Sequence, residues 1–285
     1  MNNLLEETEF ILKKYKIRAN KGLGQNFLVS EEVVNNIVES SQISKEDLVI
    51  EIGPGLGTLT KELLERAGKV ICIELDRKMI NILEDRFALY DNFSVLNQDV
   101  LKVDLKHIIE NEKSKGLKNA KVVANLPYYI TTPIIMKLLE EKLDLESITV
   151  MIQKEVADRL IAIPSERNTG AITYTVYYYA EAEAVMEVPK DSFVPEPEVT
   201  SKVIKLKIRK APPVIVKDSK VMFAIIKSAF MQRRKTLLNA LTNTKVFLNK
   251  QEGIEILNKL GLNENIRAEE LKLEDFARIA EQIIK

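Results

Sequence analysis

The tetrapeptide Asn125-Leu126-Pro127-Tyr128 carries groups that can act on an amino group attached to an aromatic ring. The side-chain oxygen of Asn125 and the backbone carbonyl of Leu126 can accept hydrogen bonds from its two N–H groups, which favours the tetrahedral, nucleophilic form. Pro127 holds Leu126 extended and removes a competing donor, while Tyr128 offers a flat face for an extruded base. A simple turn at a strand end uses the same Asn-x-Pro chemistry, so the tetrapeptide alone leaves both interpretations open.

A glycine-rich stretch, Glu51-Ile-Gly-Pro-Gly-Leu-Gly57, separates a predicted strand from a predicted helix. Glycines let the backbone approach a ligand closely, and the helix N-terminus beyond them favours negative charge. The spacing is Gly-x-Gly-x-Gly, and Thr58 stands where a dinucleotide fingerprint needs its third glycine. The stretch therefore indicates a ligand-binding loop, and its spacing speaks against the alternative of a dinucleotide-dependent oxidoreductase.

Polar residues follow three further predicted strands. Glu74 ends the second strand, about 20 residues past the glycines, where a carboxylate can accept hydrogen bonds from ribose hydroxyls. Asp99 follows the third strand and can accept a bond from an adenine amino group, and Asn125 ends the fourth. Each residue alone could cap a helix or turn. Together with Gly53 they converge at the carboxyl ends of neighbouring strands, where open sheets bind ligands.

The elements that position these residues alternate between short apolar strands and helices. Such alternation predicts a parallel sheet covered on both faces. The predicted strands are 48–52, 69–75, 94–97, 120–124 and 148–152, and the helices among them are 58–67, 79–87 and 134–141. Before the first strand we expect a helix over 4–16, no regular structure over 21–28, and a second helix capped by Ser30.

The pattern changes after the fifth strand. Residues 172–188 are aromatic and β-branched, and residues 203–208 alternate apolar with basic side chains, so we expect an antiparallel hairpin that closes one edge of the sheet. The tyrosines at positions 174, 177, 178 and 179 are then strand residues. Pro212-Pro213 marks a boundary, and the following apolar residues have helical spacing. We expect an α/β domain over 1–210 and a small all-helical domain over 211–285.

Charge is distributed unevenly along the chain. The 285 residues include 42 basic and 42 acidic ones, so the overall balance points to no particular partner. From residue 212 onward, however, there are 13 basic and 9 acidic residues, and the segment 219–251 has seven basic and no acidic ones. This asymmetry is compatible with an anionic partner and equally with a solvated helix face.

A single cysteine, Cys72, and a single histidine, His107, limit the possible chemistry. They exclude an internal disulfide, a cysteine zinc site and a two-histidine metal site, so we expect no metal and interpret both residues as structural. The N-terminus lacks the apolar core of a signal peptide. No apolar run reaches the roughly 18 residues needed to cross a bilayer. We expect a cytoplasmic protein.

Eight short motifs, taken in order, resemble those of the ribosomal RNA adenine dimethyltransferase family along nearly the whole chain. They are Gly24–Leu28, Glu51–Gly55, Ile73–Asp76, Gln98-Asp99, Asn125–Tyr128, Gln153–Val156, Phe193–Pro197 and Gln232–Lys235. Any one of them is weak, but eight in order are specific. The resemblance implies an α/β fold with a seven-stranded Rossmann-like methyltransferase sheet, a small C-terminal all-helical domain, and S-adenosylmethionine as the methyl donor.

The resemblance also implies roles for individual residues. The residues that would contact the cofactor are Asn26, Leu28, Gly53, Glu74, Asp99 and Asn125. The residues that would hold the target adenine are Asn125, Leu126, Pro127 and Tyr128, with Phe193 packing on the other face of the base. The adjacent cations Arg233, Arg234 and Lys235, on a predicted helix, would contact RNA phosphates.

Residues 230–239 resemble one branch of the family more than the other. That branch dimethylates two adjacent adenosines in the 3′-terminal hairpin of small-subunit (16S) ribosomal RNA and contributes to subunit biogenesis. The alternatives are the branch that dimethylates a large-subunit adenosine and confers macrolide resistance, and an assembly factor that binds RNA but rarely turns over. We expect the small-subunit enzyme, acting as a monomer on the assembling subunit. One departure from the family pattern is Asn168-Thr-Gly-Ala171, where an aromatic residue is expected before Gly170.

Overall fold

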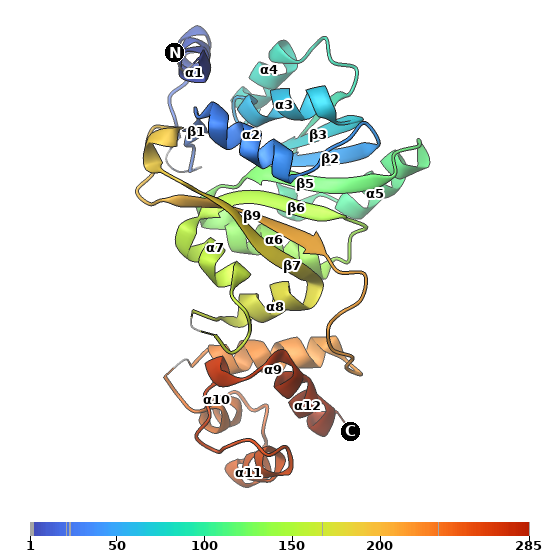
Figure 1. Cartoon of the computed structure of the whole chain (residues 1–285), viewed down its shortest axis with the longest axis vertical. Coiled ribbons are helices and arrows are strands. Elements are labelled where there is room, and N and C mark those ends of the chain that lie inside the picture. Colours follow the sequence, from blue (N-terminus) through green and yellow to red (C-terminus); the bar gives the residue numbers. More distant parts are fainter. Residues whose placement is uncertain (1–2, 21, 23, 167, 233, 285) are drawn as a thin grey trace. The chain divides into compact units, whose positions relative to one another are not determined.

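Seven strands form a mixed sheet in the order β4-β3-β2-β5-β6-β9-β7 in the computed structural model, which describes residues 3–20, 22, 24–166, 168–232 and 234–284 (Figure 1). The strands are β2 (Asp47–Ile52), β3 (Lys69–Glu74), β4 (Phe93–Asn97), β5 (Asn119–Asn125), β6 (Ser147–Gln153), β7 (Ala180–Val188) and β9 (Ser201–Ile208). Strands β2 to β6 pair in parallel, and β9 runs antiparallel to β6. The predicted parallel sheet is confirmed, as is its closure at one edge by β7 and β9.

The central parallel strands β2, β3, β5 and β6 are largely buried because helices cover both faces of the sheet, whereas the edge strand β4 is only partly covered. Helices α2 (Glu31–Ser40) and α3 (Thr58–Arg66) lie on one face and α6 (Thr131–Glu140) on the other (Figure 1). All six residues of β2 are buried, as expected for a strand with no solvent-facing side. The remaining helices before the C-terminal region are α1 (Asn3–Lys14), α4 (Arg77–Arg86), α5 (Leu105–Ser114), α7 (Lys154–Ile161) and α8 (Ala171–Tyr179), with short 3₁₀ turns η2 (Val100–Lys102), η3 (Tyr128–Ile130) and η4 (Lys190–Ser192).

A second, two-stranded sheet joins distant parts of the chain. Strand β1 (Phe27–Leu28) pairs antiparallel with β8 (Phe193–Val194). The Val29 N–H extends this pairing by donating to the Ser192 carbonyl at 2.8 Å. The prediction that residues 21–28 lack regular structure is therefore wrong at its last two positions. The partner strand lies far along the chain, so no local pattern indicates the pairing.

Residues 172–179 are helical, so the predicted strand over 172–188 is wrong in its first half. Helix α8 ends at Tyr179, and β7 follows directly. Tyr174 is fully buried, and its hydroxyl donates to the Leu271 carbonyl at 2.7 Å. This tertiary burial outweighs the strand preference of an aromatic, β-branched run. The four tyrosines are helix residues rather than strand residues.

The chain divides into two compact units. One comprises Met1–Ala157 and Ala182–Ile208, and the other comprises Asp158–Glu181 and Arg209–Lys285. The second unit packs α8 with α9 (Ser219–Phe230), α10 (Leu237–Asn243), α11 (Lys250–Lys259), the turn η5 (Ala268–Glu270) and α12 (Leu273–Ile283) around a separate apolar core. The described residues from 209 onward contain no strand, which confirms the helical C-terminal region. The domain boundary at residue 210 stays a prediction.

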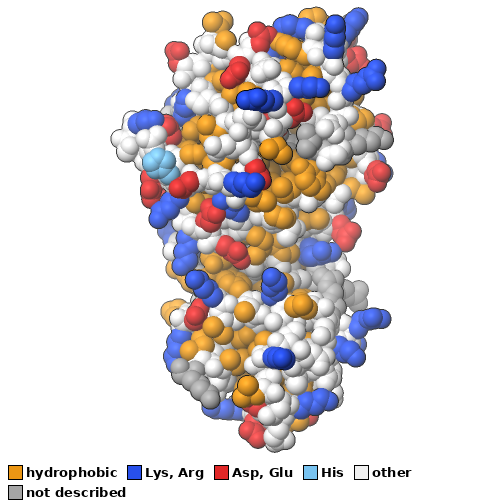
Figure 2. All heavy atoms as spheres, turned by 180° about the vertical axis from the view of Figure 1, so that it is seen from behind, with side chains coloured by type: hydrophobic (Ala, Val, Ile, Leu, Met, Phe, Trp, Pro, Cys, Tyr) orange, Lys and Arg blue, Asp and Glu red, His pale blue; other side chains and the backbone are white. Residues whose placement is uncertain are grey.

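The single cysteine, Cys72, and the single histidine, His107, lie in different environments. Cys72 is buried within β3, as predicted. His107 is exposed, and its pale blue side chain lies at the surface in Figure 2. In the part of the chain that the structure describes, no cluster of three metal-ligating side chains occurs, and no helix is both long and apolar enough to cross a membrane.

Candidate functional site

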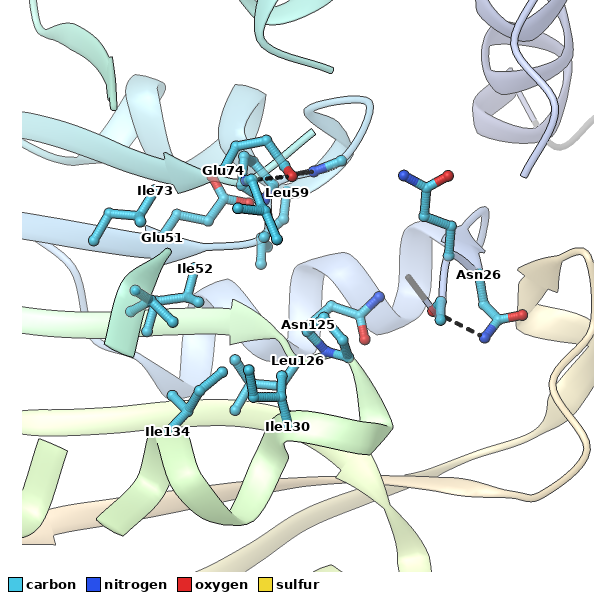
Figure 3. A pocket seen from close by; sticks show the side chains of 18 of the residues that line it. Asn26, Glu51, Ile52, Leu59, Ile73, Glu74, Asn125, Leu126, Ile130 and Ile134 are labelled. Atoms are coloured by element: carbon cyan, nitrogen blue, oxygen red, sulfur yellow. Dashed lines mark hydrogen bonds between the residues drawn. The ribbon is translucent and has the colours of Figure 1, made fainter. Parts of the chain in front are cut away.

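One pocket collects the residues predicted to hold a cofactor and a base. It lies at the carboxyl ends of β2, β3 and β5 and is flanked by β1 and β8, so segments from the two sheets contribute to it. Figure 3 shows Asn26, Glu74 and Asn125 arranged around the same space. The predicted residues that line the pocket are Asn26, Leu28, Gly53, Glu74, Asp99, Asn125, Leu126, Pro127, Tyr128 and Phe193.

The glycine stretch between β2 and α3 forms one wall of the pocket. Gly53 has a φ of 66°, in the left-handed region that favours glycine. A Cβ at Gly53 would lie 3.7 Å from Pro127 and would narrow the space between the loop and the end of β5. The Gly53 N–H donates to the Ile73 carbonyl at 2.9 Å, which fixes the loop against β3. The loop is therefore anchored to β3, and at Gly53 it offers bare backbone to the pocket.

Glu74, at the end of β3, holds its carboxylate against three backbone amides. One oxygen accepts from the N–H groups of Leu75 and Asp76, both at 2.8 Å, and the other accepts from Gly55 at 3.3 Å. Burial raises the pKa of Glu74 above its ordinary value, while the hydrogen bonds from Asp76, Gly55 and Leu75 act in the opposite direction. The oxygen that faces Gly55 makes a single long bond and retains capacity to accept bonds from a ligand's hydroxyls.

Asp99 has a structural role as well as a place in the pocket. Its Oδ1 accepts the Leu101 N–H at 3.0 Å and caps the turn η2. Its side chain is partly exposed and lines the pocket. The second carboxylate oxygen has no hydrogen-bond partner among the residues that the structure describes. Capping therefore leaves one oxygen available for a ligand.

The turn that follows β5 is held rigidly. The Leu126 N–H donates to the Met151 carbonyl at 3.1 Å, and the Pro127 carbonyl accepts from the Ile130 N–H at 3.2 Å and from the Thr131 hydroxyl at 3.1 Å. In contrast, neither the Asn125 side-chain amide nor the Leu126 carbonyl has a partner within the described ranges. The turn thus carries two unused oxygen acceptors on residues that line the pocket, in a backbone that other bonds have already fixed.

Two aromatic residues complete this end of the pocket. Tyr128 is half-buried, and its hydroxyl lies 2.5 Å from the Ser201 hydroxyl. Burial raises the pKa of Tyr128 above its ordinary value, and the bond to Ser201 opposes that shift. Phe193 is only 2% exposed and packs in the apolar core between the sheet and helices α2 and α3, called the main core below. It also borders the pocket. Tyr128 therefore offers more open ring surface than Phe193 does.

Glu51, the first residue of the glycine stretch, also lines the pocket, although the sequence predicted no role for it. Glu51 is 2% exposed, and its Oε2 accepts from the Thr60 hydroxyl at 2.6 Å and from the Cys72 thiol at 3.4 Å. Burial is the main cause that raises its pKa to about 7. A carboxylate inside the apolar run 48–52 is the sequence signal that identifies it.

The predicted RNA-binding cations belong to the second unit, outside this pocket. Arg233 lies outside the described residues. Arg234 and Lys235 are exposed and, with Lys227, have no acidic partner in the described part of the chain. The prediction that they lie on a helix is wrong, because α9 ends at Phe230 and α10 begins at Leu237. Arg234 and Lys235 occupy the short connection between the two helices, and Lys227 lies on α9.

Comparison with known proteins gives consistent matches along the chain. The sequence model described as "Ribosomal RNA adenine dimethylase" matches residues 16–285. The "Ribosomal RNA small subunit methyltransferase A" of Alkaliphilus metalliredigens (strain QYMF) is 47% identical over 277 residues, which are 97% of this chain and 96% of the relative. The protein of that name from Bacillus pumilus (strain SAFR-032) is 47% identical over 280 residues, covering 98% and 96% of the two chains.

Solved structures support the same fold. A dimethyladenosine transferase from Plasmodium falciparum superimposes with a TM-score of 0.73 at 25% identity, covering 89% of this chain and 95% of that one. The 23S rRNA methyltransferase ErmE superimposes with a TM-score of 0.68 at 23% identity, covering 91% and 100%. The similarity to ErmE supports the fold only.

Proposed function

The chain belongs to the ribosomal RNA adenine dimethylase family, and from this premise we propose that it dimethylates N6 of two adjacent adenosines in the 3′-terminal hairpin of small-subunit ribosomal RNA. The proposed methyl donor is S-adenosylmethionine. Relatives named for the small subunit match nearly the whole chain, which supports this substrate over the large-subunit one. The proposed setting is the assembling small subunit in the cytoplasm, with the enzyme as a monomer.

The observation that carries the proposal is the pair of unused acceptors at the pocket. The Asn125 amide oxygen and the Leu126 carbonyl are held by a turn that is bonded elsewhere. Both N–H groups of an adenine amine can donate to these two oxygens, which draws its lone pair out of the ring and toward the methyl donor. Attack on the methyl group leaves the nitrogen as a positively charged ammonium, which is acidic and loses its proton readily, so no strong base is required.

The opposite side of the pocket fits the methyl donor. S-adenosylmethionine would supply an activated methyl group. The bare backbone at Gly53 leaves room for the methyl donor to approach the loop. The Glu74 oxygen that faces Gly55 can accept further hydrogen bonds, which suits the ribose hydroxyls of the donor. The unpaired oxygen of Asp99 suits the amino group of its adenine. Asn26 and Leu28 close the same wall from the β1 side.

Binding of the RNA is divided between the two units in this proposal. Tyr128 would stack on the extruded adenine, with Phe193 at its other face. Lys227, Arg234 and Lys235 would contact phosphates, which adds affinity without sequence preference. The selection of adenine therefore resides in the pocket of the first unit.

The test is transfer of labelled methyl from S-adenosylmethionine to small and large ribosomal subunits from a strain that lacks the modification. We expect label in small-subunit RNA, and a fall of about 100-fold or more for Asn125→Ala, because one acceptor of the reacting amine is lost. Label only in large-subunit RNA would assign the chain to the resistance branch. No label in either subunit, with RNA binding intact, would favour an assembly factor.

A further inference from the structure

Tyr129 is an exposed aromatic residue at the rim of the pocket. The residue is 59% exposed, and it lines the pocket together with Tyr128. Among the phenylalanine and tyrosine residues that the structure describes, only Phe10 and Tyr129 are exposed. Within the same ranges the Tyr129 hydroxyl makes no hydrogen bond, and its ring contacts no other aromatic ring. Other parts of the protein therefore cover little of this ring surface, and a ligand at the pocket can contact it.

The backbone holds Tyr129 in a defined position. It is the middle residue of the turn η3, which the bonds of Ile130 and Thr131 to the Pro127 carbonyl fix in place. One edge of the ring lies along Gly24, where a Cβ would be 3.5 Å from its Cδ1 atom. Ring and turn are thus arranged before any ligand arrives, which lowers the entropic cost of using the ring for binding.

Adjacent tyrosines differ in what remains available to a ligand. Tyr128 is half-buried and its hydroxyl is hydrogen-bonded to Ser201. In the proposed function, its ring stacks on the extruded base. Tyr129 follows it in the turn and points its ring surface to solvent at the same rim. When one nucleotide leaves its stack, the neighbouring base loses a stacking partner, and an exposed aromatic ring can replace that partner.

We propose that Tyr129 stacks on the base next to the adenosine being methylated. This inference rests on the proposed function, in which the two target adenosines are adjacent, so that the neighbour of a flipped adenosine on one side is the other target. The contact requires only a flat face, because every base offers one, and it therefore positions the strand rather than selecting its sequence. Tyr129 is a positioning residue and takes no part in methyl transfer.

The experiment compares two short RNA hairpins in a binding assay with the full chain. One hairpin carries two adjacent adenosines, and in the other an abasic nucleotide replaces one of them. We expect the wild-type protein to bind the intact hairpin about tenfold more tightly, equivalent to about 1.4 kcal/mol. The preference should vanish in Tyr129→Ala and persist in Tyr129→Phe, which keeps the ring. Phe10→Ala, at a similarly exposed aromatic residue, should keep the wild-type preference.

The ratio of the two affinities separates stacking from other effects. An abasic site also alters the free RNA, but that change is the same for every variant, so the comparison works as a double-mutant cycle. An unchanged preference in Tyr129→Ala would overturn the proposal. The proposal would also be overturned if Tyr129→Ala lost as much affinity for S-adenosylmethionine, measured by calorimetry, as for the intact hairpin. The ring would then serve the cofactor. A wild-type chain that methylates no ribosomal RNA would instead contradict the proposed function, and the binding ratio would still decide the stacking role.

Discussion

Leu28 and Phe193 stand opposite each other in the antiparallel pairing of β1 with β8. Both border the pocket, and both are buried in the main core. The pairing ties the segment before α2 to the loop that precedes β9. One buried contact therefore links the shape of the pocket to the stability of the first unit.

Phe193 allows packing and stacking to be separated. Phe193→Ala should destabilise the first unit by about 3–5 kcal/mol, because it removes a large, fully buried side chain. Phe193→Leu largely preserves the buried volume and should cost less than about 1.5 kcal/mol, while methyl transfer falls through loss of the aromatic face. Urea unfolding and methyl-transfer assays on both variants measure these effects. Full activity in Phe193→Leu would show that the ring acts only in packing.

Glu74 should control the affinity for the methyl donor. Glu74→Ala removes an acceptor that three backbone amides hold in place, so the dissociation constant of S-adenosylmethionine should rise by about 10- to 100-fold. Isothermal calorimetry measures this change, and circular dichroism checks that the variant keeps its overall secondary structure. Glu65→Ala is a control, because that exposed carboxylate on α3 lies outside the residues that line the pocket. An unchanged affinity in Glu74→Ala would remove this residue from the proposed site.

The strands that carry the pocket could be predicted because buried parallel strands are continuous apolar runs. Glu74 and Asn125 could be placed at the pocket for the same reason, since parallel strands end at one edge of the sheet. The pairing of Leu28 with Phe193 was not predictable, because it depends on contact between remote segments. Tyr174 misled the strand prediction, because its burial in the second unit is decided by tertiary packing.

The roles of Glu51 and Tyr129 needed the structure for a different reason. Residue type alone does not show that the Glu51 carboxylate is bonded to Thr60 and Cys72, or that the Tyr129 ring is left uncovered at the rim. Burial and exposure are properties of the folded chain, and they decide what a carboxylate or an aromatic ring can do.

Glu51 should make stability depend on pH. Burial raises its pKa from 4.5 to about 7, so the folded protein binds more protons than the unfolded chain between these values. The resulting stabilisation is fully present below pH 4.5 and is lost as the pH rises through 7. Between pH 5 and pH 8 the loss is on the order of 2–3 kcal/mol.

The matched variant for this effect is Glu51→Gln, which has no titrating group and still offers an oxygen to Thr60. Urea unfolding of both proteins at pH 5 and pH 8 should show that wild-type stability falls more steeply than that of the variant. Parallel pH dependences in the two proteins would mean that Glu51 stays ionised in the folded state.

Lys121 and Asp47 form a buried ion pair between β5 and β2, with 2.9 Å between Nζ and Oδ2. Lys121 Nζ also donates to the Gln42 carbonyl at 2.6 Å, and Asp47 also accepts from the Asn119 amide at 2.9 Å. Lys121→Met should destabilise the first unit by about 3–5 kcal/mol, because Asp47 is left as a buried charge without its cation.

The neighbouring pair of Lys118 and Glu46 supplies the control for this prediction. Its side chains are 65% and 56% exposed, so Lys118→Met should cost no more than about 1 kcal/mol. Urea unfolding of the two variants gives the comparison directly. Equal effects would mean that water reaches Asp47 in the folded protein and replaces the lost partner.

Arg234 should contribute to RNA affinity through charge alone. It is exposed in the connection between α9 and α10, with no acidic partner in the described ranges. Arg234→Glu should weaken binding of small-subunit RNA by about tenfold and reduce the slope of log affinity against log salt by about one, because one phosphate contact is lost. Cofactor affinity should not change, since Arg234 is not among the residues that line the pocket. Lys259→Glu makes the same charge change at the end of α11 in the same unit. If both variants weaken binding equally, the second unit attracts RNA through its overall charge, and the α9–α10 connection has no special role.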